Sequence, residues 1–209
     1  MEEVLPERSL GQKACDRLFL LWLIKKSSPL DTYKLQKLPF RLEYELGQEG
    51  KRAFNYEFFQ YDQGPLSIQV YEDRDFLKEH SLISVDGYTA QITPEGERLL
   101  SSFDFVFESN AAITNRLAEI AGRFSGKTGI ELVEDTHEMV IEMNGKRVKV
   151  GDLPKYTAIL EKPVRTCLEV DPPTLETLIV LFDRNLIANL RQARREGSTS
   201  SPYERPISV

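Results

Sequence analysis

The sequence predicts an α+β fold that is mainly α, and three stretches in the first half of the chain carry this prediction. An aromatic, β-prone run at residues 54–61 is followed by a Gly-Pro turn and then by a helical pattern from residue 68. The Asp-Gly dipeptide at 86–87 separates two short apolar segments and favours a hairpin, because glycine accepts positive φ without steric cost. Thr93 and Pro94 then mark the start of another helix. Helix, two short strands and helix in this order predict a winged helix-turn-helix.

Two helices are expected before this region. The first covers residues 12–26, where apolar residues recur at helical spacing and two lysines end the run, as suits the negative end of the helix dipole. The second begins at a cap formed by Asp31 or Thr32 and continues towards residue 46. Pro39 lies inside its pattern, so we expect it to kink this helix or to split it into two short ones.

The strand, the helix behind it and the hairpin must share a core that fixes the angles between them. We therefore expect apolar residues from all three elements to form one buried cluster. Its expected members are Phe58, Phe59, Leu66, Val70, Phe76, Leu77, Leu82 and Ile92.

The second half of the chain is expected to be a helical C-terminal extension. Apolar residues near the 3.6-residue period predict a helix over 105–124 and a long final helix over 174–195. Residues 131–143 fit a helix too, but Asn144-Gly145 also allows a hairpin there, and periodicity leaves both interpretations open.

These elements divide the chain into three parts. We expect a winged helix-turn-helix domain at residues 1–104, a helical C-terminal region packed on it at 105–196, and a disordered tail at 197–209. The tail is rich in serine and proline and has few apolar residues with which to bury a core. An irregular connection is expected over 151–173, where several prolines interrupt the patterns.

The composition of the 209 residues is that of an ordinary globular protein, with 41% hydrophobic and 29% charged residues. The longest apolar run, residues 18–24, is too short to cross a bilayer, and the first ten residues are acidic where a secretory signal would be basic. We therefore expect a cytoplasmic protein with no membrane partner. Cys15 and Cys167 lie on apolar patterns and are expected to be buried free thiols.

Motifs for catalysis, cofactors or metals are weak throughout the chain. The GKT sequence at 126–128 lacks the first glycine and the preceding strand of a phosphate loop, and therefore predicts a surface turn. His137 lies among acidic residues, but a solvated helix face explains this pattern more simply than a metal site does. We therefore expect a protein that is not an enzyme, with no catalytic, cofactor-binding or metal-binding residues.

Four segments together carry a family resemblance. They are the KLQKL sequence at 34–38, the aromatic strand with Phe59 and Tyr61, the turn at 64–67 and the helix start at 93–96. In this order they resemble the Panacea domain of SocA-like antitoxins and related uncharacterised winged-helix proteins. The chain departs from the family pattern where two residues separate the tyrosine from Gly-Pro, and where a proline follows the KLQK element. The resemblance implies a non-enzymatic module that binds a protein or a nucleic acid.

Basic residues on the second predicted helix are candidates for contact with a partner. Lys34, Lys37 and Arg41 are spaced three and four residues apart, so they share one face of that helix. This basic stripe fits a phosphate or an acidic partner, although a solvated face gives the same spacing. A second basic cluster at residues 191–195 is also explained by the dipole at the end of the final helix.

The helix behind the Gly-Pro turn argues against DNA as the main partner. It contains Glu72, Asp73 and Arg74, and its acidic side chains outnumber its basic ones. Carboxylates in a major groove would face the phosphates, and the net charge of -6 also opposes DNA binding. The expected function is therefore a regulatory module that binds a protein in an antitoxin-like manner; a winged-helix DNA-binding transcriptional regulator is the alternative, and self-association is left open. The residues expected to bind the partner are Lys34, Lys37, Arg41, Glu72, Asp73 and Arg74.

Overall fold

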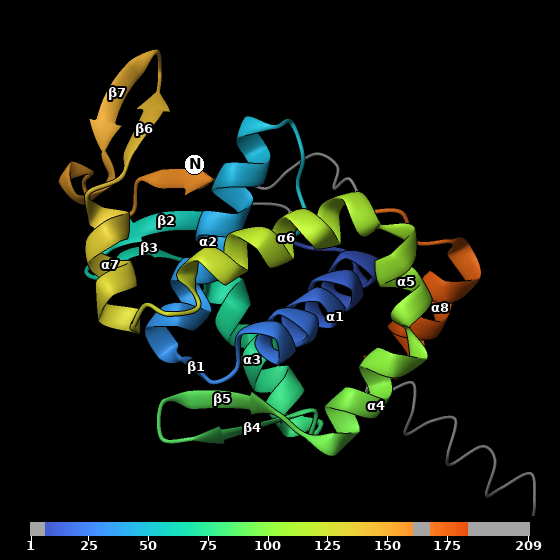
Figure 1. The fold of residues 1–209 in the computed structure, drawn as a ribbon. Helices are drawn as coiled ribbons and strands as arrows, with labels where there is room; N and C mark the ends of the chain where they lie inside the picture. Colours follow the sequence, from blue (N-terminus) through green and yellow to red (C-terminus); the bar gives the residue numbers. More distant parts are fainter. Residues whose placement is uncertain (1–6, 161–167, 184–209) are drawn as a thin grey trace, which may run out of the picture.

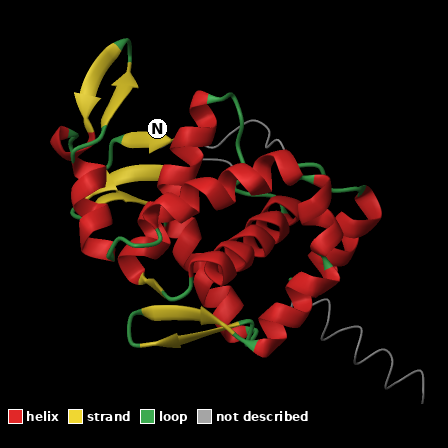
Figure 2. Cartoon of the chain, viewed as in Figure 1, coloured by secondary structure: helices red, strands yellow, loops and turns green. Residues whose placement is uncertain are grey.

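A computed structural model describes residues 7–160 and 168–183, and the fold is α+β and mainly helical, as the sequence predicts (Figure 2). The described elements lie in the order α1 (Leu10–Ser27), β1 (Leu30–Asp31), α2 (Thr32–Gln48), β2 (Phe58–Tyr61), β3 (Gly64–Leu66), α3 (Ile68–Glu79), β4 (Ile83–Asp86), β5 (Thr89–Ile92), α4 (Pro94–Ser102), α5 (Asp104–Ser109), α6 (Ala111–Phe124), α7 (Gly129–His137), β6 (Val140–Met143), β7 (Lys146–Lys149), the 3-10 turn η1 (Val150–Asp152), β8 (Ala158–Leu160) and α8 (Pro172–Leu181).

Helix α1 runs through the middle of the molecule, with other helices around it (Figure 1). Ser9 caps its start in a capping box with Gln12, which satisfies backbone N–H groups that the helix leaves free. Every residue from Leu18 to Ile24 is buried, so this segment packs on all of its faces. The apolar run that is too short to span a bilayer is therefore the centre of the core. No helix within the described residues is long and apolar enough to cross a membrane.

Helix α2 begins where the sequence predicts, with the Asp31 carboxylate accepting a hydrogen bond of 2.8 Å from the Lys34 N–H. It continues through Pro39 as one helix, so of the two expected effects of the proline, a kink or a split into two helices, the split is wrong. Proline removes one backbone hydrogen bond, but apolar residues before and after it lie in the same core. Their shared burial offsets the local cost of the proline.

Two three-stranded antiparallel sheets flank the helices. The strand order is β1-β5-β4 in one sheet and β3-β2-β8 in the other, and β6 and β7 form a separate hairpin. Leu30 of β1 pairs with Ala90 of β5, while Phe58 of β2 pairs with Leu160 of β8. Neither β1 nor β8 follows from the sequence pattern, because each has only two or three residues. The β4–β5 hairpin around Gly87 confirms the expected hairpin.

Helix α4 starts in close contact with the end of α3. Thr93 caps this helix by accepting a hydrogen bond from the Gly96 N–H, and its own N–H donates to the Leu82 carbonyl at 3.1 Å. A Cβ atom on Gly96 would lie 2.2 Å from the Leu82 oxygen and 2.9 Å from Cγ1 of Ile92. Glycine is required here because the two backbones meet without room for a side chain.

Substituting Gly96→Ala should lower the free energy of unfolding by about 1–3 kcal/mol, because the methyl group would push α4 away from a backbone oxygen. The matched control is Gly122→Ala in α6, where a Cβ would have no neighbour within 4 Å. That substitution should be neutral or slightly stabilising, since alanine favours a helix. Urea unfolding of both variants measures the difference, and equal stabilities would contradict the close contact.

The predicted helix over 105–124 is wrong as a single element, because it breaks at Asn110 into α5 and α6. The Asn110 side chain is buried and holds the backbone of Glu169: its Nδ2 donates to the Glu169 carbonyl at 2.8 Å and its Oδ1 accepts from the Glu169 N–H at 2.7 Å. These two bonds fix residues 168–171 beside α5. The side chain at the break therefore bonds to a residue 59 positions later in the chain, which the sequence pattern does not reveal.

Both interpretations of residues 131–150 are partly correct. A helix, α7, occupies 129–137, and the β6–β7 hairpin follows around Asn144-Gly145. Asp171 caps α8 by accepting from the Thr174 N–H. The part of the predicted final helix beyond residue 183, the basic cluster at 191–195, the tail and Cys167 lie outside the described residues. Cys15 is a free thiol, and it is partly rather than fully buried.

The expected apolar cluster is present in part. Phe58, Val70 and Leu77 are buried in the main core, and Phe76, Leu82 and Ile92 are partly buried against it. Phe59 and Leu66 are half-buried and lie outside this core. Successive side chains of a strand point to opposite faces, so Phe58 faces inward while its neighbour Phe59 faces the other side of β2.

Candidate functional site

A hollow of about 250 Å³ opens between α3, the β4–β5 hairpin and the start of α2, and we call it the hairpin groove. Buried or partly buried apolar side chains form its bottom, and polar side chains surround them. The apolar residues are Leu30, Leu35, Val85 and Ala90, and the others are Thr32, Arg74, Asp75, Lys78, Gly87 and Tyr88.

Pairing of the strands positions this groove. Because β1 pairs with β5, the chain enters α2 directly beside the hairpin. The hydroxyl of Thr32 donates to the Tyr88 carbonyl at 3.2 Å and so ties the turn of the hairpin to α2. The Tyr88 side chain remains 82% exposed at the tip. An exposed aromatic side chain on an anchored turn costs little ordering entropy when it contacts a partner.

The rim of the hairpin groove carries both signs of charge. Arg74 donates from Nε and Nη2 to Oδ1 of Asp75 at 2.8 and 2.6 Å, and its guanidinium lies 4.9 Å from the centre of the Tyr71 ring. Lys78 and Glu79 are exposed further along α3. The groove therefore combines an apolar bottom with tyrosine, arginine and carboxylate groups, which is the composition of many protein-binding surfaces.

Asp73, which the sequence predicts to contact a partner, is fully buried, so that prediction is wrong for this residue. Its carboxylate accepts from Arg8 at 2.6 Å, from Arg17 at 3.0 Å and from the Tyr56 hydroxyl at 3.1 Å. A carboxylate held by three donors is a structural group. Its neighbour Glu72 is exposed, because one step along a helix turns a side chain by about 100°.

Asp73 belongs to a buried ionic network that joins α1, α3 and the segment before β2. Arg8 also donates to Asp16 at 2.8 Å, and the other oxygen of Asp16 accepts from the backbone and side-chain N–H groups of Asn55 at 2.9 and 3.0 Å. Burial raises the pKa of Asp16 to about 7, although the charge of Arg8 acts in the opposite direction. A single guanidinium thus holds two buried carboxylates from different helices.

The basic stripe is not one open face. Lys37 is only 2% exposed and its Nζ donates to the Pro65 carbonyl at 2.8 Å, so this lysine cannot reach a partner. Arg41 is half-buried with its guanidinium 5.0 Å from the centre of the Phe124 ring, and Lys34 donates to the Ser125 carbonyl at 3.3 Å. The spacing that aligns the three residues also places them where α6 and α7 pack on α2. The interpretation of this stripe as one solvated or phosphate-binding surface is therefore wrong for Lys37, while Lys34 and Arg41 are only partly buried.

Burial of Lys37 changes its chemistry. Its ammonium group lies among α2, β3 and α7 and hydrogen-bonds to a carbonyl, and burial lowers its pKa to about 8. The His137 ring packs beside it against Gly64, and burial together with the charge of Lys37 lowers the pKa of His137. His137 is therefore packed in this interface and is not part of a solvated acidic face.

The GKT sequence forms the turn before α7, as predicted. Thr128 caps that helix in a capping box with Glu131, and Lys127 forms an ion pair with Asp135. Among the residues that the structure describes, no three His, Cys, Asp or Glu side chains gather in a way that could hold a metal ion.

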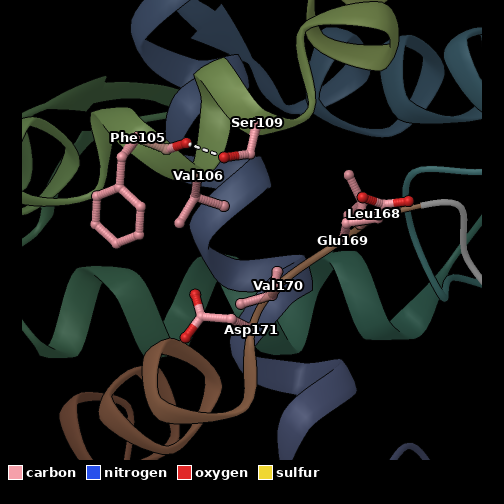
Figure 3. A pocket seen from close by; sticks show the side chains of 7 residues that line it. All are labelled: Phe105, Val106, Ser109, Leu168, Glu169, Val170 and Asp171. Atoms are coloured by element: carbon pink, nitrogen blue, oxygen red, sulfur yellow. Dashed lines mark hydrogen bonds between the residues drawn. The ribbon is translucent and has the colours of Figure 1, made fainter.

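A second hollow, of about 520 Å³, lies between α5 and the segment that Asn110 holds, and we call it the α5 pocket (Figure 3). Phe105, Val106 and Ser109 line it from α5, and residues 168–171 line it from the other side. Its charged lining residues, Glu169 and Asp171, are both acidic. Nothing in the sequence pattern indicates this pocket, because its two walls are far apart in the chain.

Of the six residues predicted to contact a partner, the structure brings only Arg74 into the hairpin groove. Sequence reasoning missed Tyr88 and Lys78. The signal for Tyr88 was present, because a tyrosine directly after the Asp-Gly turn must stand at the tip of the hairpin. Comparison with models of protein families, with curated proteins and with solved structures found no match in any of the three.

Proposed function

We propose that this chain is a non-enzymatic regulatory module of the cytoplasm that binds a protein partner through the hairpin groove. The observation that carries the proposal is the hollow of about 250 Å³, with an apolar bottom and a polar rim, beside the exposed Tyr88. An anchor side chain of a partner fits such a hollow, and the tyrosine and Arg74 at its rim belong to the residue types that dominate binding energy in protein interfaces.

The arrangement of α1 to β5 supports a winged helix-turn-helix as the framework of this module. Helices α2 and α3 come before the β4–β5 hairpin, and β1 joins that hairpin to give the order β1-β5-β4. The strands β2 and β3 lie between α2 and α3 as an addition to this framework. Together with the resemblance to the Panacea domain, this arrangement favours an antitoxin-like role in which the module neutralises another protein.

The winged-helix arrangement also favours a second candidate, a DNA-binding transcriptional regulator. The charges near the groove weigh against it. Glu72 and Glu79 are exposed on α3, Arg74 is paired with Asp75, and Lys37 is buried. Lys78 and the paired Arg74 are the cations of α3, so few remain there to replace the counterions of phosphates. For this reason we place protein binding first.

Capture from native cells under physiological salt tests this proposal with two matched variants. Tyr88→Ala with Lys78→Glu alters the rim of the groove, and Tyr156→Ala with Lys146→Glu makes the same chemical changes at exposed residues elsewhere. We expect one protein to copurify with the wild type and with the second variant, in amounts unaffected by nuclease. Its recovery with the groove variant should fall at least tenfold.

Two results would overturn the proposal. If the groove variant retains the same protein in full, the groove is not the binding surface. If the captured material is nucleic acid, and retention in gel shifts falls with the groove variant only, the DNA-binding regulator replaces the protein-binding module.

A further inference from the structure

We propose that the α5 pocket binds an arginine side chain from a basic peptide segment of a partner protein. This site is separate from the hairpin groove and does not depend on it. The proposal rests on the chemistry of the pocket walls: the Phe105 ring, Val170 and the Asp171 carboxylate line one side of the hollow, and Glu169 lines its other end (Figure 3).

Hydrogen bonds hold the two walls of the pocket in a fixed position relative to each other. Asn110 makes paired hydrogen bonds of 2.7 and 2.8 Å with the backbone of Glu169, and its Nδ2 also donates to the Val106 carbonyl of α5 at 2.8 Å. Asp171 is held in turn as the cap of α8. A site with fixed walls loses little conformational entropy when a ligand enters.

The charge of the pocket selects a cation. Glu169 and Asp171 are exposed, and the hydrogen bond from Thr174 lowers the pKa of Asp171, so this carboxylate is ionised at neutral pH. Within residues 7–160 and 168–183 neither Glu169 nor Asp171 forms an ion pair, and the second carboxylate oxygen of Asp171, which does not cap α8, can accept from an added cation.

The shape and the apolar lining favour arginine over lysine. Phe105 is 47% exposed, and in Figure 3 its ring and the Asp171 carboxylate lie on the same side of the pocket, with Val106 and Val170 near them. A planar guanidinium can stack on an aromatic ring while it binds a carboxylate in bidentate fashion, and an ammonium group cannot. The methylene stem of arginine would cover Val170, which is partly exposed, while Val106 lies buried behind it. At about 520 Å³ the hollow has room for the side chain and for part of the peptide that carries it.

The test is an NMR titration of the full chain with the peptide acetyl-Ala-Arg-Ala-amide, with matched peptides that carry citrulline or lysine in place of arginine. We expect saturable shifts of backbone amides in residues 105–110 and 168–171 with the arginine peptide. Citrulline has nearly the same shape without the charge, so its affinity should be at least tenfold weaker, and the lysine peptide should fall between the two.

Substitutions on each wall of the pocket measure how much that wall contributes to arginine binding. Asp171→Asn keeps a residue that can cap α8 and should weaken arginine binding about tenfold, and Phe105→Leu should remove the preference for arginine over lysine. Glu108→Gln removes one exposed carboxylate of α5 that does not line the pocket and should change the affinity less than twofold. Equal binding of citrulline, shifts confined to other regions, or equal losses with Glu108→Gln and Asp171→Asn would each refute the proposal.

Discussion

Replacing Arg8 by methionine should lower the free energy of unfolding by about 3–5 kcal/mol, the largest effect of a single substitution expected in this chain. The methionine leaves Asp16 and Asp73 buried without the guanidinium that holds both of them. Hydrogen bonds from Asn55 and Arg17 remain, but two buried carboxylates would then share less positive charge. Urea unfolding at pH 7, compared with the wild type, measures the loss.

The pH dependence of this stability loss shows whether the buried charge of Asp16 causes it. Without Arg8 the pKa of the buried Asp16 should rise further, so the folded chain binds a proton that the unfolded chain releases. Stability then falls as pH rises, and the loss caused by Arg8→Met should be smaller at pH 5 than at pH 8. Arg98→Met, which removes an exposed pair with Glu95, serves as the control and should cost less than 1 kcal/mol at either pH. A loss for Arg8→Met as small as that of the control would show that the network does not depend on Arg8.

The stability of the wild type relative to Lys37→Met should rise by about 2.5 kcal/mol between pH 7 and pH 10. The folded-state pKa of Lys37, about 8, lies below its ordinary value of 10.5, because burial disfavours the charged form. Between these two values the unfolded chain binds more protons than the folded chain, so raising the pH stabilises the wild type. Below pH 8 the full cost of burying the charge is present. Methionine has no proton to lose and should remove this part of the pH dependence.

Lys34→Met is the matched control for Lys37→Met. Lys34 lies one turn earlier on α2 and is partly exposed, so its substitution removes a lysine from the same helix without changing the buried site of Lys37. Unfolding in urea at pH 7, 8, 9 and 10 gives the comparison, since other groups that titrate in this range are common to all three proteins. A stability difference between the wild type and Lys37→Met that stays constant with pH would mean that Lys37 keeps its ordinary pKa when folded.

Local signals in the sequence predicted the elements that depend on a few adjacent residues. Asp31, Gly87 and Thr93 act as cap, turn and cap in the structure because the chemistry of each involves only its neighbours. The break at Asn110 was missed because the side chain bonds to residue 169. Strand β8 was missed for the same reason, since its pairing with β2 is invisible in three residues of sequence.

The candidate surface was harder to predict than the fold. Glu72 and Asp73 look alike in the sequence, yet only Asp73 is buried, because its side of α3 packs against α1, from which Arg17 reaches it. Lys37 belongs to a basic stripe whose helical spacing was correctly identified, but α7 covers that face. The spacing of residues in the sequence determines which of them share a helix face. Whether that face is exposed to solvent depends on how elements distant in the sequence pack against it.

The pairing of β2 with β8 also has a consequence during synthesis on the ribosome. Residues 58 and 59 leave the ribosome about one hundred residues before 158–160, so β2 has only β3 beside it while the chain between β3 and β8 is being made. During that time its second edge presents unpaired N–H and C=O groups next to the aromatic side chains of Phe58, Phe59 and Tyr61. Such an edge can pair with any extended strand, including the same strand of another nascent copy. Early folding of this protein is therefore open to misassociation at β2 until β8 is synthesised and covers that edge.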